Sequence, residues 1–208
     1  MREALQWIRS LGLEPVLRDY LASNGPSLTN PYHGMAHGLR VAYAAGQAVA
    51  EMGGENDAVR TATVAGLFHD WEHPGKMGPG HDDKLNVDRS ALKVATLLDG
   101  PFGFSRMEAA EAIRDTQYPY NKFKPSELGL VLRDADIWHM AALTEMEFLE
   151  IQAGLAAEMG GVPLGEWIAG NAKFIEVAET WTSWGERQAE GNRKRLVTWC
   201  KRWAGQLS

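Results

Sequence analysis

Residues 67–75 read LFHDWEHPG, and the interpretation of the whole chain starts from them. The run follows an apolar helical segment and places two histidines and an aspartate directly before a Pro-Gly helix stop. His73 follows His69 by four residues, so we expect both imidazoles on one face of a helix. Asp70 beside His69 is costly to bury without a partner. The segment therefore predicts either a metal site or a polar helix end.

The composition is that of an ordinary globular protein. The chain has 208 residues, 45% hydrophobic and 23% charged, enough for one domain with a sizeable core. The formal net charge of −6 argues against a broad basic surface for nucleic acid. A single cysteine, Cys200, excludes an internal disulfide and fits a reducing compartment. With no signal-like or membrane-spanning run, we expect a cytoplasmic protein that binds neither nucleic acid nor membrane.

Helical periodicity runs through nearly every long segment, and no segment alternates convincingly like a strand. Glycine, proline and capping residues divide the chain into helices expected over about 2–22 (one or two short helices), 32–52, 58–71, 84–98, 105–116, 126–159 (with a kink near 139) and a C-terminal pair within 163–204. The helix over 32–52 carries a small-residue face for close packing. We therefore predict an all-α fold, a single domain over 1–208 with about eight to ten helices.

Two further segments carry residues that suit a metal site. The segment YHGMAH, residues 32–37, places His33 and His37 one helical turn apart, a spacing that aims two side chains at one site. The segment RDADIW, residues 133–138, inserts two acids into an apolar helix, where an unpaired carboxylate is costly.

Asp134 and Asp136 point about 200° apart on a helix, so only one of them can face a given ion. We assign the metal to Asp136 and a salt bridge with Arg133 or another arginine to Asp134. His139, one turn after Asp136, either contacts the ligands or is simply packed. Five tryptophans in the C-terminal helices are expected in the core or an interface rather than stacked on a base. They are Trp167, Trp181, Trp184, Trp199 and Trp203.

Together these residues resemble the H…HD…D signature of the HD-domain metal-dependent phosphohydrolases. The signature is carried by His37, His69, Asp70 and Asp136. The match is closer to the class I cyclic-nucleotide phosphodiesterases. Their Y-H-N-x-x-H-A-x-x-V element is similar to residues 32–41, and their H-D-x-D-H-P-G element is similar to residues 69–75. The resemblance implies an HD-domain helical bundle with its metal-site core in about residues 30–140, on which the helices of residues 163–204 pack.

The resemblance also implies roles by position. His33 corresponds to the general acid, and His37, His69, Asp70 and Asp136 correspond to the ligands of a first metal. Asp70 also corresponds to the carboxylate that bridges to a second metal, which makes it a catalytic residue as well. His73 corresponds to a residue near the bridging water. One or two divalent ions are implied, with Zn, Fe, Mn or Co at the first site and Mg or Mn at the second.

Five further residues are candidates for contact with substrate or with the ligands. They are His81 in the loop at 76–83, Asn86 and Asp88 in the next helix, and Thr116 and Gln117, which stand roughly where the family has a T-D pair. An exposed loop histidine and an ordinary solvated helix start are the alternative interpretations. Diiron oxygenase chemistry needs two more histidines before Asp136 and is not expected.

The expected function is hydrolysis of a phosphoester bond in a nucleotide, most closely that of a 3′,5′-cyclic nucleotide phosphodiesterase. The alternatives are a 5′-nucleotidase or dNTP triphosphohydrolase of the same superfamily, and a non-catalytic HD module that binds a nucleotide. The Q-V-G-F-type element that clamps a purine in the family is absent from this chain, so the sequence does not identify the base. The expected partner is a small-molecule nucleotide, and a homodimer is allowed.

Overall fold

The structure, a computed structural model, describes residues 1–76, 83–97, 102–120 and 124–207. Within these ranges the chain forms ten α-helices and two 3-10 helices and no strand, which confirms the all-α prediction. The α-helices are α1 Arg2–Ser10, α2 Glu14–Ser23, α3 Met35–Glu51, α4 Asn56–Phe68, α5 Asp83–Ala95, α6 Arg106–Arg114, α7 Glu127–Trp138, α8 Glu145–Glu158, α9 Leu164–Val177 and α10 Ser183–Leu207. The 3-10 helices cover Gly25–Thr29 and His139–Ala142.

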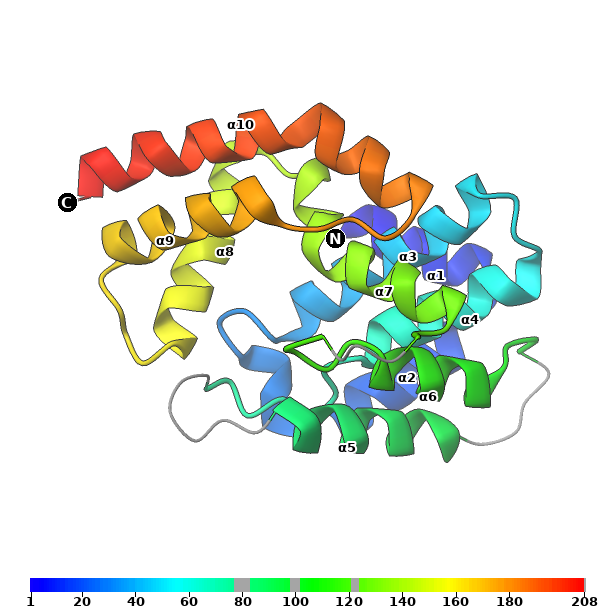
Figure 1. Cartoon of the computed structure of the whole chain (residues 1–208). Helices are drawn as coiled ribbons and strands as arrows, with labels where there is room; N and C mark the ends of the chain where they lie inside the picture. The colour runs from blue at the N-terminus through cyan, green and yellow to red at the C-terminus, as the bar shows by residue number, and fades with distance from the viewer. Residues whose placement is uncertain (77–82, 98–101, 121–123, 208) are drawn as a thin grey trace.

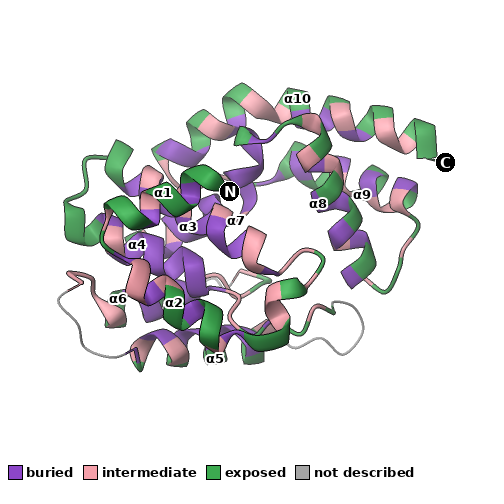
Figure 2. Ribbon diagram, turned by 180° about the vertical axis from the view of Figure 1, so that it is seen from behind, coloured by how far each residue is buried: buried purple, intermediate pink, exposed green. Residues whose placement is uncertain are grey.

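Helices α3, α4 and α7 form the centre of the bundle (Figure 1). Helices α5 and α6 lie side by side along one edge, and α10 runs along the opposite edge, with α8 and α9 beneath its C-terminal half. Buried residues are concentrated in the three central helices, whereas the outer faces of α2, α5 and α10 are exposed (Figure 2). One hydrophobic core includes residues of α1 and α10 and of the helices between them.

Helices α3 and α4 pack closely because both present small residues to each other. Ala42, Ala45 and Ala48 of α3 are fully buried, which confirms the predicted small-residue face. A Cβ atom at Gly66 of α4 would lie 2.8 Å from the Cα of Ala42 and from the carbonyl oxygen of Val41. Since these are backbone atoms, only glycine allows this approach.

Gly66→Ala is therefore expected to destabilise the protein, by about 1–3 kcal/mol, because the two central helices must separate to admit the methyl group. Chemical denaturation of the purified variant measures the loss. Gly191→Ala in α10 is the matched control, since nothing lies within 4 Å of a Cβ there. Alanine at that helical position should stabilise the protein by up to about 1 kcal/mol. Equal stability of the Gly66 variant and the parent would contradict the packing argument.

The start of α3 differs from the expectation. The helix begins at Met35 rather than at Tyr32, so His33 precedes it. The carboxylate of Glu158 at the end of α8 accepts hydrogen bonds from the backbone amides of Tyr32 and His33, at 2.7 and 3.0 Å. A Cβ at Gly34, the residue before α3, would lie 2.7 Å from the Asn30 carbonyl oxygen. Contacts with a distant helix thus fix this segment outside the helix.

The end of α4 also differs from the predicted end at about residue 71. The helix stops at Phe68, and Glu72 has a φ of 55°, in the left-handed region. The side chain of Asn24 accepts a hydrogen bond from the Glu72 amide at 2.6 Å, which holds this turn. His69 and His73 therefore do not share a helix face, and the expectation that they do is wrong.

Asp134 in α7 is fully buried and joins α7 to the start of α10. It accepts hydrogen bonds from the Thr182 amide (2.8 Å), the Thr182 hydroxyl (2.7 Å) and the Trp181 amide (3.2 Å). Burial raises the pKa of this carboxyl group, while the same hydrogen bonds lower it. Among the described residues no arginine or lysine pairs with Asp134, so the predicted salt bridge is wrong. Amide and hydroxyl donors from a loop 47 residues away replace it.

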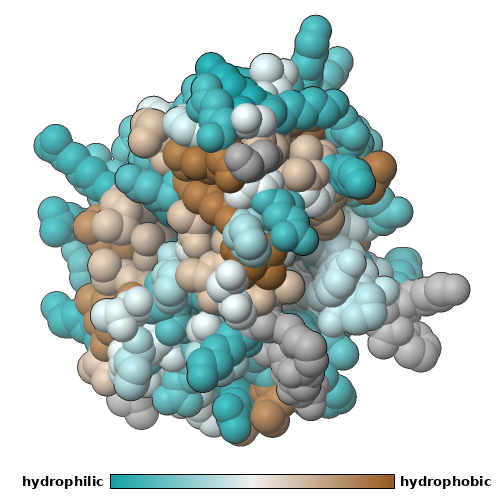
Figure 3. Space-filling model, turned by 90° about the vertical axis from the view of Figure 1, so that its left-hand side faces the viewer, coloured by the Kyte–Doolittle hydropathy of each residue, from teal (hydrophilic) through white to brown (hydrophobic). Residues whose placement is uncertain are grey.

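The C-terminal helices behave as expected for core packing. Trp184 is 4% exposed, and the other four tryptophans are partly buried against the core. Figure 3 shows the end of the molecule at which α8 and α9 lie in Figure 1. This end has hydrophobic surface near its middle and hydrophilic side chains above and at both sides. None of the helices in the described ranges combines the length and apolar character that a bilayer span requires.

Candidate metal centre

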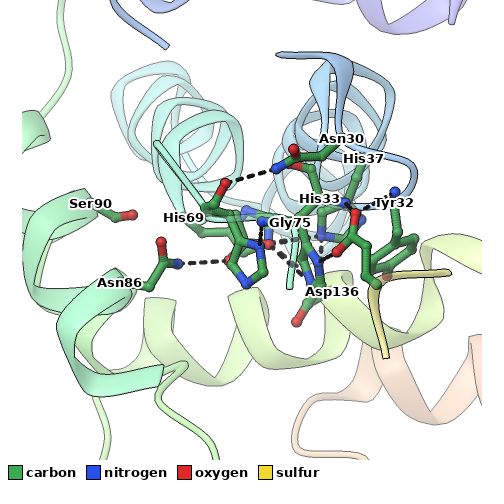
Figure 4. A network of polar contacts seen from close by, with 12 residues as sticks. Asn30, Tyr32, His33, His37, His69, Gly75, Asn86, Ser90 and Asp136 are labelled. Carbon is green, nitrogen blue, oxygen red and sulfur yellow. Dashed lines mark hydrogen bonds and ion pairs between the residues drawn. The ribbon is translucent and has the colours of Figure 1, made fainter. Parts of the chain in front are cut away.

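The four side chains predicted as ligands converge from three parts of the chain. Figure 4 labels three of them, His37, His69 and Asp136. His37 lies in the first turn of α3, His69 and Asp70 directly follow α4, and Asp136 lies in the last turn of α7. The two imidazoles are buried, at 1% and 2% exposed, whereas the carboxylates of Asp70 and Asp136 are 20% and 32% exposed. The cluster is therefore closed toward the core and accessible on the carboxylate side.

The ligand atoms are spaced as one divalent ion requires. His37 Nε2 lies 3.0 Å from His69 Nε2, 3.2 Å from Asp70 Oδ2 and 3.2 Å from Asp136 Oδ1. His69 Nε2 lies 2.9 Å from Asp70 Oδ2 and 3.5 Å from Asp136 Oδ1. Two ligands bound about 2.1 Å from an ion and at right angles are about 3.0 Å apart. His37, His69 and Asp70 are therefore close enough together to hold a single ion, and Asp136 Oδ1 is within ligand spacing of both imidazole nitrogens.

A hydrogen bond to the backbone directs the lone pair of the His69 imidazole. His69 Nδ1 contacts the Gly66 carbonyl oxygen at 2.8 Å, which requires a proton on Nδ1 and leaves Nε2 as the metal-binding atom. His139 Nδ1 contacts the Asp136 carbonyl oxygen at 2.7 Å in the same way. Burial, and then the charge of His37, lower the pKa of His139 to about 3, so its imidazole is neutral. His139 is thus a packed residue behind the ligands.

The charges of the cluster favour cations. Burial alone would raise the pKa values of Asp70 and Asp136, but the facing histidines hold both well below their usual range. Conversely, burial alone would lower the pKa values of His37 and His69, but the same carboxylates raise them. Protons and a divalent ion therefore compete for these nitrogens. Metal affinity should fall as the pH drops below the raised pKa values of the histidines.

The other predicted residues divide into two groups. Asn86 of α5 is brought to the centre, where its side-chain amide donates to Asp70 Oδ1 at 3.3 Å. Asp88 is exposed and pairs with Lys84 on the outer face of α5. In the described part of the chain, no contact links Thr116 or Gln117 to the centre; the Thr116 hydroxyl donates to the Ile113 carbonyl. His81 lies outside the described residues.

Glu158 is the functional candidate that the sequence analysis missed. It is 2% exposed, and its Oε2 lies 2.5 Å from His33 Nδ1. His33 Nε2 in turn lies 3.9 Å from Asp70 Oδ2. A carboxylate at the C-terminal end of a helix is disfavoured by the helix dipole. That unfavourable position was the signal available in the sequence.

His73 lies with this pair rather than with the four ligands. Its ring stacks on that of His33, with centroids 3.8 Å apart. The ligand atoms of His33, His73 and Glu158 are close enough together to hold an ion of their own. However, His73 Nδ1 accepts from the Gly75 amide, and both Glu158 oxygens already accept hydrogen bonds. The arrangement fits a hydrogen-bonded support for His33 better than a second metal site.

Comparison of the chain with protein-family models, with curated proteins and with solved structures gave no match. The helical architecture is observed directly, whereas membership of the HD superfamily stays a prediction from the motifs. The site is therefore interpreted from its own geometry and chemistry.

Proposed function

We propose that this chain is a metal-dependent phosphohydrolase that cleaves a phosphoester bond in a nucleotide, most closely as a 3′,5′-cyclic nucleotide phosphodiesterase. One observation carries the proposal: the Nε2 atoms of His37 and His69 lie 3.0 Å apart, and each lies 2.9–3.5 Å from a carboxylate oxygen of Asp70 and of Asp136, in three separate segments. A divalent ion bound there would supply Lewis acidity and a water of lowered pKa. The similarity of residues 32–41 and 69–75 to the phosphodiesterase elements supports the cyclic-nucleotide substrate.

The residues of the chain have separable tasks in this proposal. His37 and His69 present their Nε2 atoms, and the Gly66 carbonyl oxygen keeps the His69 ring in the required tautomer. Asn86 holds the carboxylate of Asp70 in place. His33, kept on Glu158 through Nδ1, would give the proton on Nε2 to the leaving alkoxide oxygen.

The alternatives from the sequence use the same ligands. A 5′-nucleotidase or dNTP triphosphohydrolase of this superfamily does not need His33 as an acid. The buried carboxylate that holds His33 beside Asp70 therefore favours the phosphodiesterase. Ligation by imidazole and carboxylate suits Zn, Fe, Mn or Co. Within the described residues, Asp70 Oδ1 contacts only Asn86, so protein ligands support one ion and a second would be held mostly by water.

Elemental analysis followed by a substrate screen tests the proposal. Protein loaded with Mn, Mg, Co or Zn is assayed with cyclic mononucleotides, cyclic dinucleotides, nucleoside monophosphates and dNTPs. We expect bound metal and hydrolysis of a cyclic mononucleotide. Activity on monophosphates or dNTPs alone would assign the chain to the alternative enzymes. A protein that binds no metal and cleaves none of the four classes would overturn the enzymatic proposal in favour of a nucleotide-binding module.

Glu158→Gln is expected to lower the rate of cyclic-nucleotide hydrolysis by about tenfold or more and to leave the metal content unchanged. Burial opposes ionisation of Glu158, but hydrogen bonds with His33 and the backbone amides hold its pKa below the usual value. The carboxylate is therefore charged at neutral pH, and it holds the His33 ring through Nδ1. Glutamine keeps an oxygen for the amides but removes that charge.

The matched control is Glu150→Gln, the same change at an exposed position of the same helix. It should leave both the rate and the metal content unchanged. If Glu158→Gln lost its metal together with its activity, Glu158 would be a structural residue and would not position the acid.

A further inference from the structure

Beside the metal centre lies a cluster of aromatic rings around one arginine, which the proposed chemistry does not use. Arg133 of α7 is 5% exposed. Its guanidinium carbon lies 4.5 Å from the ring centroid of Tyr120 and 5.7 Å from that of Trp181. Tyr120 meets Tyr118 edge to face, with centroids 5.5 Å apart, and Tyr118 is 62% exposed.

One helix position and two hydrogen bonds place this cluster next to the proposed metal centre. Arg133 lies three residues before Asp136 in α7, so both occupy the same side of that helix, about 4.5 Å apart along its axis. The amide of Tyr118 donates to the carboxylate of Asp83 at 2.6 Å. Asp83 begins α5, and Asn86, one turn later, contacts Asp70. Burial, followed by the charge of Asp136, raises the pKa of Tyr120, as expected for a phenol near that carboxylate.

Arg133 lacks the hydrogen bonds that a buried arginine normally makes. Its Nε donates to the Asp115 carbonyl oxygen at 2.6 Å, but its terminal nitrogens have no hydrogen bond or ion pair within the described residues. Arg193 provides the comparison, because it also lies over a tryptophan ring, that of Trp138. Its terminal nitrogens donate to three backbone carbonyls of residues 175–178. Both terminal nitrogens of Arg193 are thus hydrogen-bonded, whereas within the described residues those of Arg133 are not.

We propose that Tyr118 and Arg133 form the subsite for the base of the nucleotide and that Arg133 selects guanine, an inference that rests on the proposed function. The exposed ring of Tyr118 offers a face on which a base can stack. The unpaired terminal N–H groups of Arg133 match two neighbouring acceptors, which guanine presents as O6 and N7. Adenine places a donor beside N7 and cannot accept both hydrogen bonds. Tyr120, stacked on the guanidinium, holds its plane and is a positioning residue.

Calorimetric titration of the metal-loaded protein with GMP and with AMP tests the subsite. We expect GMP to bind about tenfold tighter than AMP. Arg133→Lys, which keeps the charge but loses the paired donors, should bring the two affinities close to equality. Tyr118→Ala should weaken both about tenfold, and Tyr118→Phe should restore them. Phe174→Ala, at an exposed aromatic residue of α9 far along the chain, is the control and should change neither affinity.

Equal binding of GMP and AMP by the parent protein would overturn the guanine assignment, whether or not the Arg133 variant folds. A preference for GMP that is retained in a folded Arg133→Lys variant would overturn the guanine assignment as well. Unchanged binding by Tyr118→Ala would show that the base does not stack on Tyr118. The hydrolysis screen separates this inference from the proposed function. Selective GMP binding without hydrolysis of any phosphoester would contradict the function alone, whereas hydrolysis of a cyclic nucleotide without base preference would contradict the subsite alone.

Discussion

Asp70→Asn is expected to remove bound metal and hydrolysis together, with turnover falling by about a thousandfold or more. The Oδ2 atom of Asp70 faces both imidazoles of the proposed metal centre, at 3.2 Å from His37 Nε2 and 2.9 Å from His69 Nε2. Asparagine has nearly the same shape but no charge, so two buried imidazoles would share the ion with a single carboxylate. Metal content by elemental analysis, compared with kcat on the same preparation, measures the effect.

Asp88→Asn supplies a control with the same chemical change. Asp88 is exposed on α5 and pairs with Lys84 outside the centre, so metal content and kcat should stay at the values of the parent. If Asp70→Asn kept its full metal content and lost only activity, Asp70 would act on the substrate and would not be a ligand. The four-ligand centre would then be wrong.

His33→Ala is expected to keep the metal and to slow hydrolysis of a cyclic nucleotide by about 10²–10⁴-fold. His33 is not needed as a ligand, since its Nδ1 is held by Glu158 and its Nε2 lies 3.9 Å from Asp70 Oδ2. Its proton matters for an alkoxide leaving group, which is strongly basic. The rate should therefore depend on the leaving group. The measurement is kcat with a cyclic nucleotide and with bis(p-nitrophenyl) phosphate, whose nitrophenolate leaves without a proton.

The comparison of the two substrates decides whether His33 acts as the general acid. A loss confined to the cyclic nucleotide identifies the acid. An equal loss on both substrates, or a loss of metal, would make His33 a ligand or a structural residue. Full activity of the variant on the cyclic nucleotide would remove the acid assignment altogether.

The helices, and the convergence of most of the candidate ligands, could be predicted because their signals are local. Helical periodicity and the caps at Ser105 and Ser126 mark the helices. The carboxylate of Asp136 stands out because an unpaired charge in an apolar stretch is costly. His69 and Asp70 come directly before a helix stop. Each of these features depends on residues that are close together in the sequence.

What could not be predicted depends on contacts between distant residues. Asn24 holds the turn at Glu72, which ends α4 early and moves His73 away from His69. Asp134 bonds the loop before α10 rather than an arginine. Glu158 lies 125 residues after His33 in the chain. No pattern within one segment specifies such pairs, because they form only when helices pack.

Because Glu158 lies in α8, the groups of the proposed reaction come from two separate parts of the chain. Every proposed metal ligand precedes residue 137, whereas the carboxylate that holds His33 belongs to the last turn of α8. Helix α8 meets the segment before α3 at Gly154, where a Cβ would strike the Pro31 carbonyl oxygen. The two backbones touch there, and both Glu158 oxygens bond to residues 32–33, so the end of α8 is fixed to the segment before α3. The orientation of the proposed acid therefore depends on a helix that contributes no proposed metal ligand.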